Sequence, residues 1–86
     1  QRPLSKLGIG VDELPERIKK SSILTGSDLS RLATIEQLPD KETVDNYILK
    51  HPGLKEKTKE ELHRLAKEEL KADRVLQAWY VLMATL

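Results

Sequence analysis

The sequence of 86 residues predicts an all-α domain: a compact four-helix bundle-like fold with three short helices packed on a long C-terminal helix, and an N-terminal arm. Two observations carry this prediction. Apolar residues recur every three or four positions in four segments, and Pro and Gly residues punctuate the chain between them. No segment alternates polar and apolar residues for long enough to make a strand. We expect residues 1–10 to form a flexible or loosely packed arm and residues 11–86 a single helical domain.

The three short helices are expected near residues 12–21, 28–37 and 41–51. In the first, Asp12 is a candidate cap, and Pro15 is tolerated because the first helical turn needs few backbone donors. In the second, Thr25 and Asp28 have the spacing of a capping box, with Ser27 as a competing cap. The caps therefore set where these two helices are expected to begin.

Proline marks where the second and third helices end. Pro39 disfavours helical geometry in the residue before it, so the second helix is expected to stop there. The third helix follows Asp40 as its cap, and Pro52 and Gly53 stop it.

A fourth, longer helix is expected from about residue 59 to the end of the chain. Thr58 and Glu61 form a second capping-box pattern, and no Gly or Pro lies between Thr58 and Leu86. Asp73 is the expected place for any break, because Asp is a poor residue for the interior of a helix.

The last twelve residues, VLQAWYVLMATL, carry no charge in a chain that is 34% charged. The segment is too short to span a bilayer, which takes about 20 residues. Its apolar residues lie on every helical face, which predicts a buried central helix. Trp and Tyr favour interfaces and Met adapts to varied partners. The candidate partner-binding residues are therefore Trp79, Tyr80, Val81 and Met83.

The composition argues against several classes of function. Fifteen basic residues nearly balance fourteen acidic ones, which disfavours a dedicated nucleic-acid binder. His63 has Glu60 one turn before it but no second His nearby, so we expect His63 to be a surface residue rather than a metal ligand, and His51 to compensate the dipole at a helix end. No phosphate-binding loop or nucleophile elbow is present. We expect no enzymatic activity, no catalytic or metal-binding residue and no cofactor. The absence of Cys and of a recognisable signal peptide favours an intracellular location.

The sequence thus predicts a non-catalytic protein–protein interaction domain, an adaptor or regulatory module within a larger protein or assembly, whose partner is another protein. The first alternative is a nucleic-acid-binding domain resembling a helix-turn-helix through residues 28–50, with contacts from Arg31, Lys41 and Lys50. The second is homo-oligomerisation through the C-terminal helix.

Overall fold

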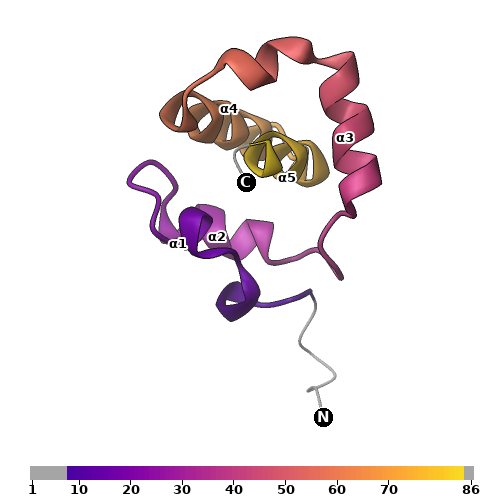
Figure 1. The fold of residues 1–86 in the computed structure, drawn as a ribbon. Coiled ribbons are helices and arrows are strands. Elements are labelled where there is room, and N and C mark those ends of the chain that lie inside the picture. The colour runs from indigo at the N-terminus through magenta and orange to yellow at the C-terminus, as the bar shows by residue number, and fades with distance from the viewer. Residues whose placement is uncertain (1–7, 85–86) are drawn as a thin grey trace.

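The computed structural model describes residues 8–84, and the regular structure within that range is entirely helical (Figure 1). Its elements are the 3-10 helices η1 (Val11–Glu13) and η2 (Pro52–Glu56) and the α-helices α1 (Glu16–Lys19), α2 (Gly26–Leu32), α3 (Lys41–Lys50), α4 (Lys59–Lys71) and α5 (Val75–Met83). The radius of gyration is 12.7 Å, close to the value of roughly 12 Å expected for a folded chain of this length. The prediction of a compact helical domain without strands is confirmed over this range. Residues 1–7 of the expected arm lie outside it.

Helix α5 occupies the middle of the domain and contacts α2, α3 and α4 (Figure 1). Its residues Ala78, Trp79, Val81 and Leu82 are all buried. A short helix surrounded by others on most sides can bury apolar residues over most of its circumference, which explains the uncharged C-terminal segment.

The expectation of one long C-terminal helix is wrong, because the chain turns between α4 and α5 at Asp73. This residue has a positive φ of 62°. The N–H of Arg74 bonds the Glu69 carbonyl at 2.9 Å, and the N–H of Asp73 bonds the Leu70 carbonyl at 3.0 Å. This pair of bonds is a Schellman motif, which ends a helix by using its last free carbonyls. The break lies at the residue where the sequence predicted one.

The expected helix over residues 12–21 is also wrong, because Leu14 and Pro15 divide it. Leu14 is extended, with φ −68° and ψ 144°. A residue before proline is pushed out of the helical region by the proline ring. The segment therefore forms the short η1, a break, and then α1, which has no side-chain cap from Asp12.

Helix α2 begins at Gly26, two residues before the expected residue 28, and ends five residues earlier than the expected residue 37. Both capping boxes are confirmed, Thr25 with Asp28 at α2 and Thr58 with Glu61 at α4.

Two backbone carbonyls at the end of α2 are used by distant parts of the chain. The Leu32 carbonyl accepts a 2.8 Å bond from the indole N–H of Trp79. The Ala33 carbonyl accepts a 3.0 Å bond from the N–H of Ile9, which is itself buried. The N–H of Gly10 donates to the same Ala33 carbonyl at 3.4 Å, so both lone pairs of that oxygen are used and none is left for the N–H four positions later in a longer helix. Tertiary packing thus ends α2 before Pro39 does.

Helix α3 agrees with its predicted range. Asp40 occupies the N-cap position without a side-chain bond to the helix backbone, and its carboxylate instead accepts from the Thr43 hydroxyl. At the other end, the ring of His51 stacks on Tyr47 with centroids 4.2 Å apart.

Candidate functional site

A pocket of about 320 Å³ lies between α3 and the C-terminal end of α5. Its lining residues are Lys41, Val44, Asp45, Ile48, Met83 and Ala84. Val44 and Ile48 lie four residues apart and form the buried stripe of α3. The pocket is therefore mainly apolar at its base, with the charged residues supplied by the first turns of α3.

On the same side of α5 as Met83, which lines the pocket, the helix carries a partly exposed apolar stripe. Leu76, Tyr80 and Met83 are spaced by four and three residues, so they share one side of the helix. Leu76 is 50% exposed, and Tyr80 and Met83 are half-buried. The Tyr80 ring packs against Tyr47 of α3 with centroids 5.0 Å apart. We call this surface the α3–α5 face; its residues are Val44, Tyr47, Ile48, Leu76, Tyr80 and Met83.

The charges around the α3–α5 face are largely paired. Lys41 and Asp45, at the pocket, form an ion pair of 2.9 Å between Nζ and Oδ2. Arg74 is paired with Glu69 just before α5. Burial raises the pKa of the Tyr47 hydroxyl, and the Glu69 carboxylate acts in the same direction while Arg74 opposes it. Tyr47 therefore stays a neutral phenol at neutral pH. Because the neighbouring charges are paired, the surface offers mainly apolar contacts and no patch of positive or negative charge.

The structure divides the four predicted partner-binding residues into two pairs. Trp79 and Val81 are 0% and 1% exposed, so neither offers surface to a partner in this conformation. Tyr80 and Met83 lie on the α3–α5 face. Sequence reasoning did not select Leu76, although its spacing to Tyr80 and Met83 was a visible signal.

The three basic residues of the nucleic-acid alternative are not gathered into one patch. Arg31 pairs with Asp73 at the turn between α4 and α5, and Lys41 pairs with Asp45. Lys50 is nine positions after Lys41 on α3, which places the two on opposite sides of that helix. Residues 33–40 separate α2 from α3, whereas a helix-turn-helix uses a turn of roughly three to four residues.

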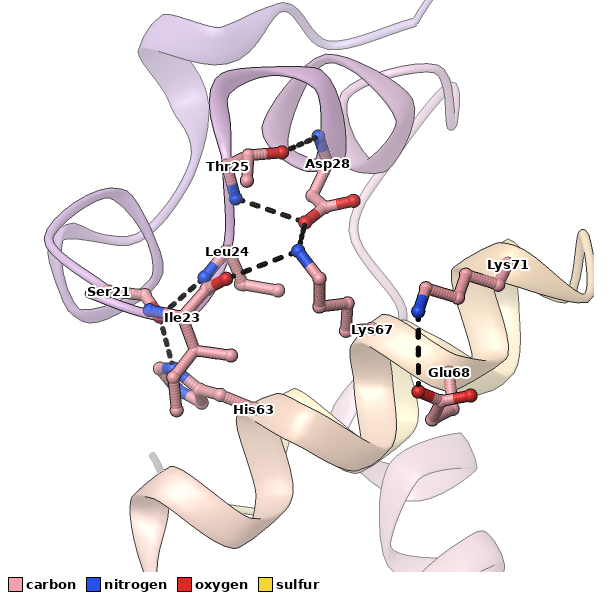
Figure 2. A network of polar contacts seen from close by, with 9 residues as sticks. All are labelled: Ser21, Ile23, Leu24, Thr25, Asp28, His63, Lys67, Glu68 and Lys71. Atoms are coloured by element: carbon pink, nitrogen blue, oxygen red, sulfur yellow. Dashed lines mark hydrogen bonds and ion pairs between the residues drawn. The ribbon is translucent and has the colours of Figure 1, made fainter.

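A second polar cluster joins α4 to the segment between α1 and α2 (Figure 2). Lys67 bonds the Asp28 carboxylate at 2.9 Å and lies 3.4 Å from the Ile23 carbonyl oxygen. Burial acts to raise the pKa of Asp28, but the Thr25 N–H and the Lys67 ammonium outweigh it and hold that pKa below its ordinary value. One turn earlier on α4, the buried His63 bonds Ser21. These contacts fasten α2 and the segment before it to α4.

Within residues 8–84, no group of three or more His, Asp or Glu side chains is arranged to hold a metal ion. Over the same part of the chain, no helix is long and apolar enough to cross a membrane.

No protein-family model, curated protein or solved structure matches this chain.

Proposed function

We propose that this bundle-like helical domain is a non-catalytic adaptor or regulatory module, and that its α3–α5 face binds an amphipathic helix of a partner protein. The observation that carries the proposal is the apolar stripe of Leu76, Tyr80 and Met83, which runs beside α3 and ends at a pocket. An amphipathic helix bound in an apolar groove is one of the common ways in which proteins recognise a peptide segment.

The size of the pocket supports an apolar anchor as its occupant. About 320 Å³ lies at the lower end of the range of roughly 300–1,000 Å³ found for small-molecule sites. Met83 and Ile48 contribute apolar atoms to it, and the Lys41–Asp45 pair at the same pocket is already satisfied. A cavity of about 150 Å³ holds one benzene ring, so this space has room for about two large apolar side chains of the partner, which would desolvate it.

The length of the stripe supports a helix as the element that carries the anchor. Leu76 and Met83 lie seven residues apart on α5, a rise of roughly 10 Å. Side chains at positions i, i+4 and i+7 of a partner helix have the same spacing and would meet the three stripe residues in turn. Because the neighbouring charges are paired, the binding free energy is expected to come mainly from apolar burial, with a weak dependence on salt.

The test uses a displayed library of helical peptides about five turns long, selected on the wild-type domain. Peptides enriched by the selection are then measured by titration calorimetry against Met83→Glu and against Leu49→Glu as the matched control. Leu49 is 73% exposed on α3 and does not line the pocket. Met83→Glu should weaken binding by a factor of about ten or more, the effect of losing roughly 1.4 kcal/mol, whereas Leu49→Glu should leave it unchanged.

Circular dichroism verifies that both variants retain the helical fold. A selection that yields no binding peptide, or peptides equally sensitive to both substitutions, would contradict the proposal. Light scattering over a range of protein concentrations tests whether a second copy of the chain, rather than a partner helix, occupies the α3–α5 face. A dimer that Met83→Glu dissociates would replace the partner helix with a second copy of the chain.

A further inference from the structure

His63 is a titratable side chain held inside the domain, at the contact between α4 and the segment from Ser21 to Leu24 (Figure 2). The residue is 1% exposed, and its Nδ1 lies 2.7 Å from the Ser21 Oγ. The same Ser21 oxygen is 3.1 Å from the backbone nitrogens of both Ile23 and Leu24. One hydroxyl thus organises the turn before α2 and ties it to α4.

The contacts of Ser21 decide which way its proton points. A hydroxyl oxygen has two lone pairs, and here the N–H groups of Ile23 and Leu24 donate to both. The hydroxyl proton is therefore directed at the remaining neighbour, Nδ1 of His63. Nδ1 must accept this bond, so the neutral ring carries its hydrogen on Nε2. That nitrogen is buried and has no hydrogen-bond partner among residues 8–84.

A second proton on the ring is incompatible with this arrangement. Protonation at Nδ1 would place two hydrogens between the ring and the Ser21 oxygen. The hydroxyl would have to turn away, and it could not do so while both Ile23 and Leu24 donate to its lone pairs. A charged imidazolium would also remain buried with its Nε2–H unpaired, which is strongly unfavourable.

The charged groups around His63 do not compensate for that penalty. Burial lowers the pKa of His63, Lys59 of α4 acts in the same direction, and Glu60 of α4 opposes them. On the facing elements, the Asp28 carboxylate of α2 is held by Lys67 of α4. Beside Ser21, Lys20 directly follows α1 and pairs with Glu16 of that helix.

We propose that the Ser21–His63 hydrogen bond is a pH-sensitive latch, which holds residues 21–24 against α4 at neutral pH and releases them when His63 becomes charged. Release frees the buried Leu24 and the half-buried Ile23. Lys67 and Asp28 keep their ion pair, because both remain charged in weak acid. The opening is therefore local: α2 stays attached to α4 while the turn before it detaches.

The direction of the pH dependence follows from linkage. A histidine whose pKa is lowered in the folded state binds fewer protons there than in the open state. The latch is then fully closed above the ordinary histidine pKa of about 6.5 and weakens as the pH falls below it. Asp28 and Glu61 also have lowered pKa values, but their stabilisation is lost only near and below about pH 4.5. The interval between about pH 5 and pH 7 thus isolates His63.

The test is amide hydrogen exchange followed by NMR at about pH 7.5 and about pH 5.5, expressed as protection factors corrected for intrinsic rates. Protection of the Ile23 and Leu24 amides should fall by about tenfold at the lower pH, the factor set by one pH unit below the ordinary pKa. The Ala66 amide in the middle of α4 should keep its protection. The pH midpoint of the loss should coincide with the titration of the His63 ring in the open state.

Two variants complete the experiment. His63→Asn places an acceptor oxygen on the same side-chain carbon as Nδ1 and cannot gain a proton in this range, so the pH-dependent loss should vanish. His51→Asn removes the only other histidine, which is exposed, and should leave the loss intact. Unchanged protection of Ile23 and Leu24 in the wild type, an equal loss at Ala66, or persistence of the loss in His63→Asn would each overturn the latch. If His63→Asn does not fold, the wild-type profile and His51→Asn decide the matter.

Discussion

Replacing Trp79 with alanine should lower the free energy of unfolding by about 3–5 kcal/mol, the range found when a large aromatic residue is removed from a core. Trp79 is 0% exposed and lies on α5, which contacts three other helices. Domains of this size are stable by only about 5–15 kcal/mol. We therefore expect Trp79→Ala to lose a large share of its stability and to unfold at a much lower urea concentration than the wild type, as measured by circular dichroism.

Trp79→Phe removes the hydrogen bond while keeping part of the aromatic packing. Phenylalanine retains an aromatic ring but cannot donate to the Leu32 carbonyl, which accepts the indole N–H at 2.8 Å. An unsatisfied buried acceptor is destabilising by about 1–3 kcal/mol. Tyr80→Phe is the matched control, because Tyr80 is the half-buried neighbour on the same helix, and it should change stability by less than about 0.5 kcal/mol. Equal effects from the two substitutions would show that the Trp79 bond does not stabilise the fold.

Replacing Gly8 with alanine should detach Gly8 and Ile9 from the end of α2. A Cβ atom at this position would lie 2.1 Å from the Ala33 carbonyl oxygen, and the backbone has a φ of +85°. Both the contact and the left-handed conformation disfavour any side chain. Detachment would expose Ile9, which is 6% exposed in the structure. We expect a loss of about 1.5–3 kcal/mol, the value of burying one large aliphatic side chain.

Gly26→Ala is the control for Gly8→Ala, since it makes the same change in a different setting. A Cβ at Gly26 would meet nothing within 4 Å, and the residue lies in the first turn of α2. Alanine should stabilise the domain there by up to about 1 kcal/mol, because it restricts the unfolded chain. The two variants should therefore move the urea midpoint in opposite directions. A Gly8→Ala midpoint equal to that of the wild type would rule out the close packing of this segment on Ala33.

The sequence predicted the helix ends that are fixed by caps and prolines close by in the chain. Thr25 and Thr58 begin α2 and α4 through capping boxes, and α3 has the range that Asp40 and Pro52 indicated. The turn at Asp73 was also visible as a weak point. The sequence did not show whether the chain would bend at that residue, because an Asp inside a helix destabilises the helix only modestly.

The remaining differences come from contacts between residues far apart in the sequence. At the end of α2, Trp79 donates to the carbonyl of Leu32, and Ile9 and Gly10 both donate to the carbonyl of Ala33. Nothing near residue 33 in the sequence shows that those carbonyls are used elsewhere. The burial of His63 has the same origin, because the Ser21 hydroxyl that it bonds is 42 positions away.

The candidate site was predicted in part for a related reason. Tyr80 and Met83 were selected for their chemical character, and both lie on the α3–α5 face. Trp79 was selected on the same grounds but belongs to the core. Only the position of α3 along α5 shows which side of the central helix is open, and that position is set by tertiary packing.

The most direct test of α5 as the central helix is the fluorescence of Trp79, the only tryptophan in the chain. The structure predicts a blue-shifted emission maximum in the folded domain, little quenching by acrylamide, and a shift to the red on unfolding in urea. A red-shifted, readily quenched emission from the folded domain would show that Trp79 faces water and would contradict the placement of α5 at the centre of the fold.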